Sequence, residues 1–269
     1  MAAGDRLAVS GATALVTGAT GGIGQAIARA LAAHGARLIL TGRRRDELER
    51  LSGELGARVL VADLAARGDV ERLAAEAAAV DILIANAALP ASGLLLDLSQ
   101  DDIDRMLEIN LRAPIALARA LVPGMIARRR GQLVFISSLS GKAANPASSL
   151  YSATKFGLRG FALSLREDLR PHGVGVSVVS PGFVSGAGMF AKAGVKLPPG
   201  VGTRTPEQVA RAVLAAIERN RAEVDVAPVP LRVGAAVASV APELAARGAR
   251  LIGSHRIATE MAERQRGER

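Results

Sequence analysis

The sequence predicts an α/β fold in which a doubly wound parallel sheet of about seven strands carries helices on both faces. Two observations predict it. Short apolar runs of strand length alternate with longer helical patterns, and a glycine-rich turn joins the first run to the first helix. No internal repeat or linker divides the 269 residues, so we expect a single domain over residues 1–269, with its core at about 10–227.

Seven apolar runs have the length of strands, and the first six are each followed by a helical pattern. The predicted strands cover residues 12–16, 37–41, 58–62, 81–85, 132–136, 175–179 and, most weakly, 223–227. The predicted helices cover the stretch from the glycine turn to His34, then 44–55, the stretch after Asp63 to Ala79, 101–130, 150–171 and 206–220.

Two of these helices carry proline signals. Pro114 lacks a backbone N–H and lies inside the predicted helix 101–130, so we expect a distortion there. Pro206 suits the first position of the next helix, and Thr205 before it suits an N-cap, because its hydroxyl can accept from a free N–H.

Two segments lie outside the alternating pattern. Residues 183–205 are rich in Gly and Pro, with Met189 and Phe190 as large apolar residues, which suits a mobile loop beside a substrate. The extension 228–269 alternates apolar residues with arginines over 231–253, which predicts one or two amphipathic helices. We expect them to pack on the domain or on a second subunit; binding to an anionic membrane surface is the alternative.

Composition narrows the function classes. The chain has no cysteine, which excludes disulfides and thiolate chemistry, and its three histidines are too far apart in sequence to suggest a metal site. A net charge of +9 could favour nucleic acid, but only 2% of the residues are aromatic, which leaves few rings for bases to stack on. We therefore expect no metal and no nucleic-acid partner.

The sequence also predicts location. Met1 to Val9 lacks the apolar core of a signal peptide, and the apolar stretch Val233 to Pro242 is too short to span a bilayer. We expect a soluble, cytoplasmic protein without an integral membrane segment.

The glycine turn is the first candidate site. Gly18, Gly22 and Gly24 lie between a strand and a helix, where missing Cβ atoms let a pyrophosphate approach the backbone. The helix N-terminus would supply free N–H groups and a favourable dipole. We expect dinucleotide binding, to which Thr20 and Ile23 of the same turn also contribute.

The second predicted strand ends where an adenosine ribose would lie. A carboxylate there would bind the 2′-hydroxyl of NAD, whereas this chain has three consecutive arginines beginning at Arg43. A guanidinium can pair with the 2′-phosphate of NADP. We therefore expect NADP(H) to be preferred over NAD(H), with Arg43 as the main contact; a solvated helix start is the alternative.

Tyr151, which is the only tyrosine, and Lys155 are four residues apart at the start of the predicted helix 150–171. They would share one helix face. A nearby ammonium favours phenolate and lowers a tyrosine pKa, so we expect Tyr151 to act as an acid at neutral pH.

These features together resemble the short-chain dehydrogenase/reductase family over roughly residues 10 to 227. The resemblance rests on the glycine spacing, the Tyr-x-x-x-Lys pair, and polar or Pro-Gly residues at the ends of the predicted strands. Those residues are Asp63, Asn86, Ser138, Pro181 and Gly182, with Asn110 in the long helix. The family has a Rossmann-like fold and transfers hydride between a nicotinamide cofactor and a carbonyl or alcohol.

The resemblance implies a role for each matching residue. Tyr151 would be the general acid or base, Lys155 would lower its pKa and hold the nicotinamide ribose, and Ser138 would position the substrate oxygen. Asn110 would hold a water that links Lys155 to solvent. The cofactor would meet Asp63 and Leu64 at the adenine, Asn86 near the central strands, and Pro181, Gly182 and Val184 at the carboxamide.

Three departures from the family pattern affect these expectations. The turn 85–88 reads Ala-Asn-Ala-Ala instead of two asparagines and a glycine, Ser185 replaces a common threonine, and the chain extends past Ala227. No departure removes a catalytic group, so we expect activity. Because the loop after Phe183 carries Leu, Val, Phe and Met with few charges, we expect an apolar ketone, aldehyde or 3-oxoacyl group as the substrate. A non-catalytic dinucleotide sensor is the alternative, and the resemblance implies a homodimer or homotetramer.

Overall fold

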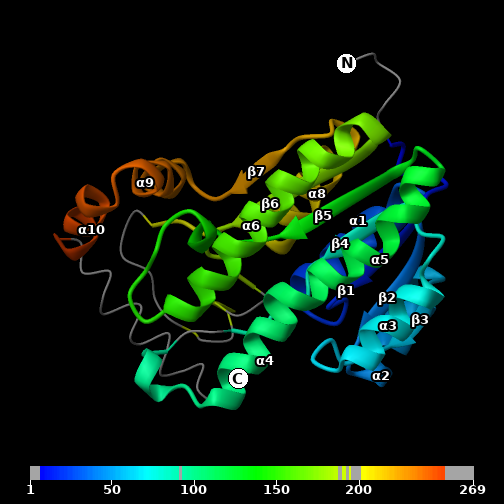
Figure 1. The fold of residues 1–269 in the computed structure, drawn as a ribbon, viewed down its shortest axis with the longest axis horizontal. Helices are drawn as coiled ribbons and strands as arrows, with labels where there is room; N and C mark the ends of the chain where they lie inside the picture. Colours follow the sequence, from blue (N-terminus) through cyan, green and yellow to red (C-terminus); the bar gives the residue numbers. More distant parts are fainter. Residues whose placement is uncertain (1–6, 91–92, 187–189, 192–193, 195–200, 252–269) are drawn as a thin grey trace.

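The computed structural model describes residues 7–90, 93–186, 190–191, 194 and 201–251 (Figure 1). Its seven strands form one parallel sheet in the order β3-β2-β1-β4-β5-β6-β7. The strands are β1 (Thr13–Thr17), β2 (Arg37–Gly42), β3 (Arg58–Val61), β4 (Ile82–Ala85), β5 (Gly131–Ile136), β6 (Val174–Pro181) and β7 (Glu223–Val226). The predicted doubly wound sheet is confirmed, with strand bounds within two residues of those expected.

Helices cover both faces of the sheet. One face carries α1 (Gly22–Ala33), α2 (Arg45–Leu55) and α8 (Pro206–Glu218). The other carries α3 (Arg67–Glu76), α4 (Gln100–Leu107), α5 (Ala113–Ala127) and α6 (Ser149–Leu169). The central strands are buried on both faces, since every residue of β5 and of β6 is buried.

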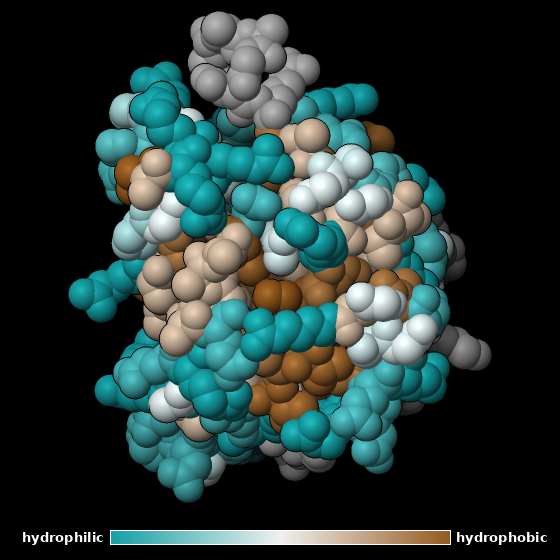
Figure 2. Space-filling view, turned by 90° about the vertical axis from the view of Figure 1, so that its right-hand side faces the viewer, coloured by the Kyte–Doolittle hydropathy of each residue, from teal (hydrophilic) through white to brown (hydrophobic). Residues whose placement is uncertain are grey.

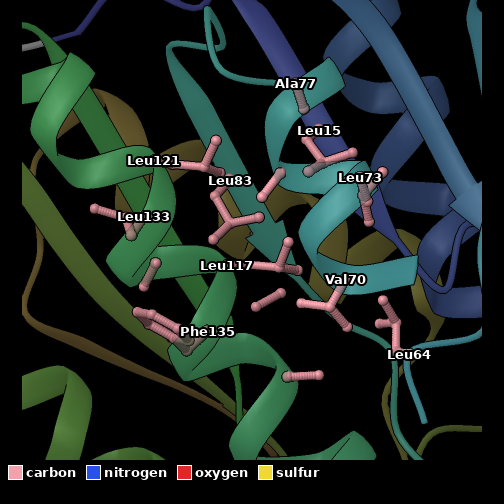
Figure 3. Close-up of a cluster of buried hydrophobic side chains, with 14 of the residues drawn as sticks. Leu15, Leu64, Val70, Leu73, Ala77, Leu83, Leu117, Leu121, Leu133 and Phe135 are labelled. Atoms are coloured by element: carbon pink, nitrogen blue, oxygen red, sulfur yellow. The ribbon is translucent and has the colours of Figure 1, made fainter. Parts of the chain in front are cut away.

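Alternate strand residues build each apolar layer. Leu15 of β1, Leu83 of β4 and Leu133 of β5 point toward α3 and α5, where Leu73 and Leu117 meet them (Figure 3). Each of these five side chains is fully buried, and burying one contributes roughly 1.5–3 kcal/mol. This layer packs α5 against the sheet. It thereby fixes the position of the side chains that the long stretch from α4 to α5 contributes to the site.

The predicted helix 101–130 is distorted where expected. A π-helical turn, Glu108–Arg112, separates α4 from α5 immediately before Pro114. Pro114 cannot donate to the Asn110 carbonyl, so the regular ladder is broken there. By length and composition alone, the whole stretch Gln100–Ala127 is long and apolar enough to cross a membrane. Residues of this stretch, Leu121 among them, pack in the core of the domain, as the residues of a core helix do.

The expected caps are present. Thr205 accepts from the Gln208 N–H of α8 at 3.4 Å, and the Gln208 side chain accepts from the Thr205 N–H at 2.9 Å. Val184 and Arg204 form an isolated parallel bridge across the ends of the loop 183–205. The sequence predicts that the loop 183–205 is mobile. Most of residues 187–200 in the middle of this loop lie outside the described part of the chain.

The extension forms two helices, as predicted: α9 (Val229–Val240) and α10 (Pro242–Leu251). They lie beyond β7, at the left of the molecule in Figure 1. Figure 2 views the opposite end, where hydrophilic side chains form much of the rim and hydrophobic residues gather near the centre.

Candidate active site

The candidate site lies at the carboxyl ends of the strands. β1 is flanked by β2 on one side and by β4 on the other, so the strand order reverses direction between β1 and β4. Open α/β sheets bind ligands at such a point, because the loops that leave the two strands diverge to opposite faces. The glycine turn leaves β1 there, and the Asn86 turn leaves β4.

The glycine turn needs its glycines for close packing. Gly18 has φ +62°, and a Cβ on it would come 2.8 Å from the Ala87 Cα. A Cβ on Gly24 would collide with the Gly18 carbonyl oxygen. Gly22 begins α1, with the partly buried Ile23 next to it. The turn is therefore folded tightly onto the start of α1.

Nothing in the first turn of α1 competes with an anion. No side chain caps the helix, and its first turn holds no acidic residue. The free N–H groups and the positive end of the helix dipole therefore suit a phosphate.

Asn86 joins the two diverging turns. Its amide nitrogen donates to the carbonyls of Thr17 at 3.0 Å and Gly18 at 3.2 Å. The Thr17 hydroxyl accepts from the N–H groups of Asn86 at 3.0 Å and Ala87 at 3.1 Å. Asn86 thus holds the shape of the turns with its side chain, and the Ala-Asn-Ala-Ala sequence is held tightly in spite of lacking a glycine.

The arginines after β2 have different surroundings. Arg43 is exposed and directly follows the strand. Arg44 crosses to the glycine turn, where it donates to the Thr20 carbonyl at 2.9 Å, and it pairs with Glu47 at 2.5 Å. Arg43 and Arg44 therefore lie at the edge of the turn.

Asp63 and Leu64 follow β3. The Asp63 carboxylate accepts from the Ala65 N–H at 3.0 Å and lies 3.4 Å from the Arg105 guanidinium. Leu64 packs in the apolar layer. Its expected contact with an adenine stays a prediction.

Ser138, Tyr151 and Lys155 come together beyond the end of β5. Ser138 accepts from the Ser140 N–H at 3.1 Å and begins the 3₁₀ turn Leu139–Gly141. Tyr151 and Lys155 lie in the first turns of α6, with the Lys155 Nζ 5.6 Å from the centre of the Tyr151 ring. The Lys155 Nζ donates to the Ile136 carbonyl at 3.0 Å.

The pKa values of this pair follow from burial. Desolvation lowers the pKa of Lys155 to about 8. Desolvation also raises the pKa of Tyr151, and its hydrogen bond with Ser138 pulls that pKa down only in part. The expectation that Lys155 lowers the pKa of Tyr151 is wrong for this state, because burial disfavours both charged forms.

Pro181 ends β6, and Gly182 and Val184 lie just after it. The Gly182 N–H donates to the Val226 carbonyl of β7 at 3.1 Å, and Val184 is buried. The hydroxyl of Ser185, which stands where the family commonly has threonine, donates to the Arg204 carbonyl at 3.4 Å. This strand end is therefore held from β7 and from the far end of the loop.

The geometry agrees with the sequence comparison. Residues 12–196 match the family model described as short chain dehydrogenase. The chain belongs to the short-chain dehydrogenase family. Enzymes of this family are oxidoreductases that act on CH–OH and C=O groups with a nicotinamide cofactor, and the seven-stranded sheet is their Rossmann-like fold.

Three similar proteins place the chain within the family. It is 37% identical over 248 residues to dehydrogenase/reductase SDR family member 7B of Bos taurus, covering 84% of this chain and 76% of that protein. It is 35% identical over 178 residues to a 3-oxoacyl-acyl-carrier-protein reductase of Rickettsia prowazekii, covering 65% and 74%. A short-chain dehydrogenase from Sphingobium yanoikuyae in complex with NADPH superimposes with a TM-score of 0.75 at 29% identity, covering 89% and 95%.

Asn110 is tied to the backbone in this short-chain dehydrogenase. Its side-chain oxygen accepts from the Leu89 N–H at 2.7 Å, and its amide donates to the Leu89 carbonyl at 3.0 Å. Both polar groups of the side chain are thus engaged. Pro114 has no N–H to donate to the Asn110 carbonyl.

Sequence reasoning missed three residues at this site. Thr17 organises the two turns, Arg44 touches the glycine turn, and Lys142 is tied to β7. A signal existed for Thr17 and Arg44, since both are adjacent to residues already selected. No local signal existed for Lys142, because its partners lie more than eighty residues away.

Proposed function

We propose that the protein reduces a carbonyl to an alcohol, or oxidises the alcohol, with NADP(H) and with Tyr151 as the general acid or base. The observation that carries the proposal is the gathering of Ser138, Tyr151 and Lys155 beyond β5, at the carboxyl-end edge of the sheet where the glycine turn also lies. When bound, the nicotinamide cofactor supplies or accepts the hydride.

The residues of the chain supply the proton chemistry. The raised pKa of Tyr151 keeps the phenol protonated, so that it can donate to a carbonyl oxygen held by the Ser138 hydroxyl. Lys155 with a pKa of about 8 can pass a proton near neutral pH. A water on the Asn110 carbonyl would connect Lys155 to solvent.

The proposed substrate class rests on the apolar character of the loop 183–205, which we expect to lie beside the substrate. Phe183 and Phe190 lie with their ring centres 4.9 Å apart, so the described loop residues offer an apolar surface. A ketone, an aldehyde or a 3-oxoacyl thioester suits it, and a relative is named as a 3-oxoacyl reductase. A cytoplasmic location, a single domain and a dimer or tetramer remain predictions from the sequence.

The test is turnover by wild type and Tyr151→Phe against a panel of apolar ketones, aldehydes and 3-oxoacyl thioesters, followed by NADPH absorbance. Loss of the acid should lower kcat by about 10²–10⁴-fold while NADPH still binds. Equal turnover by both proteins would refute the role of Tyr151. Tight NADPH binding with no turnover across the panel would support the sensor alternative.

The cofactor preference rests on Arg43 and Arg44 beside the glycine turn. Arg43→Ala should weaken NADPH binding by roughly 10- to 100-fold and leave NADH binding unchanged, because only NADPH carries the 2′-phosphate. Fluorescence titration with both cofactors measures this, and Arg45→Ala is the matched control, because Arg45 lies two positions further on, at the start of α2. Equal affinity of wild type for NADH and NADPH would contradict the preference.

A further inference from the structure

A mostly buried group of four charges lies beside the site. The Lys142 Nζ contacts Asp225 at 2.6 Å and Glu223 at 3.1 Å. Arg159 of α6 binds the same Glu223 through two bonds of 2.6 and 3.0 Å. We call these four residues the β7 charge cluster.

The β7 charge cluster is electrically balanced and shielded from water. The side-chain exposures are 10% for Lys142, 18% for Asp225, 21% for Glu223 and 29% for Arg159. Two cations face two carboxylates, and each cation contacts Glu223. Loss of Lys142 would leave Asp225 largely buried without its ion-pair partner, which is costly, whereas Glu223 would keep Arg159.

Lys142 connects the cluster to the Ser138 turn. Its N–H donates to the Leu139 carbonyl at 2.9 Å, which closes the turn that Ser138 begins. Its carbonyl accepts from the Ser239 hydroxyl of α9 at 3.1 Å. The residue before it, Gly141, packs so closely on the Lys155 backbone that a Cβ there would lie 2.7 Å from the Lys155 carbonyl oxygen.

We propose that Lys142 is a positioning residue that fixes Ser138 relative to Tyr151 by anchoring the Ser138 turn to β7 and α9. The inference rests on the proposed function of Ser138 and Tyr151. Arg159 and Tyr151 are both on α6, and Lys142 directly follows the turn that Ser138 begins. The cluster therefore ties the helix that carries Tyr151 and the turn that carries Ser138 to the same strand, β7. The extension helix α9 thereby supports catalysis without supplying a catalytic group.

Loss of the anchor that Lys142 provides for the Ser138 turn should affect the chemical step more than it affects cofactor binding. The glycine turn lies between β1 and α1, and within the described part of the chain it makes no hydrogen bond or ion pair with the cluster. A displaced Ser138 no longer holds the substrate oxygen in line with the phenol, and displacements of about 1 Å can lower rates by about 10²-fold.

The experiment compares Lys142→Met, Lys142→Arg and Ser239→Ala with wild type, measuring kcat, KM, the Kd for NADPH and Tm. Lys142→Met should lower kcat by about 10- to 100-fold with an unchanged Kd for NADPH. Lys142→Arg should recover much of the loss, because it keeps the positive charge. Ser239→Ala removes one bond of the anchor and should give a smaller loss of kcat.

A matched control separates positioning from general destabilisation. Arg166→Met removes another partly buried cation of α6, which binds Asn220 at 2.7 Å at the far end of the helix. It should lower Tm without lowering kcat. If Lys142→Met does not fold, Asp225→Asn, which keeps shape and removes one charge, takes its place.

The outcomes are distinct. Wild-type kcat in Lys142→Met, or the same kcat loss in Arg166→Met at equal Tm, would overturn the anchor. Failure of the proposed function would show differently, as an active Tyr151→Phe or an inactive wild type. A kcat loss confined to the Lys142 and Ser239 variants would support the anchor.

Discussion

Lys155 is 2% exposed, and its ammonium donates to the carbonyl of Ile136. This burial explains why its pKa falls to about 8 from an ordinary 10.5. The same burial desolvates Tyr151, and for this reason the pKa of Tyr151 is raised in spite of the neighbouring ammonium. Lys155 is therefore suited to passing protons as well as to holding charge.

Burial of Lys155 predicts a pH-dependent stability. Between pH 8 and 10 the unfolded chain keeps the Lys155 proton while the folded chain loses it, so stability rises with pH. The gain over this range is about 2 kcal/mol. Tyr151 acts in the opposite direction only above its ordinary pKa of 10.0, since its folded pKa is raised.

Urea unfolding at several pH values measures this gain. The comparison is Tyr151→Phe against the double variant Tyr151→Phe with Lys155→Met, which removes any contribution from the phenol. The difference in unfolding free energy should change by about 2 kcal/mol between pH 8 and 10. A difference that stays constant with pH would mean that Lys155 is not desolvated.

At the scale of the element, the glycine turn joins β1 to α1 by close packing. Gly24→Ala would place a Cβ against the Gly18 carbonyl, and this overpacking should cost about 1–3 kcal/mol and weaken NADPH binding. Gly21→Ala is the matched control, since its Cβ would meet only the Gly18 carbonyl at an ordinary 3.4 Å. Urea unfolding and NADPH titration of both variants test this, and equal stability would refute the packing argument.

At the scale of the whole molecule, α4 and α6 expose apolar side chains that a lone subunit leaves in water. Leu107 is 36% exposed and Phe156 is 40% exposed. The family resemblance implies that the long helices containing Asn110 and Tyr151 pair between subunits, and a dimer or tetramer would cover these exposed side chains. Val229, Val233 and Val240 of α9 are also exposed, but they lie on the extension.

Phe156→Arg should lower the molecular mass in solution, because a charge in a paired apolar face is costly. Light scattering after size exclusion measures the mass. Leu96→Arg is the control, since Leu96 is 97% exposed and lies outside these helices. A wild type that is monomeric at all concentrations would refute the assembly.

The sequence by itself determined the local features. The alternation of strands and helices, the glycine turn, the Thr205 cap, the Pro114 distortion and the Tyr151–Lys155 spacing all follow from regular backbone geometry, which repeats over a few residues. For that reason they could be predicted correctly without coordinates.

The tertiary structure alone decided the rest. Thr17 meets Asn86 because β1 and β4 are neighbours in the sheet, and Lys142 meets Asp225 across 83 positions of sequence. The pKa of Tyr151 is raised because the fold removes water from it. Sheet order and desolvation depend on how distant segments pack, and no short stretch of sequence carries that information.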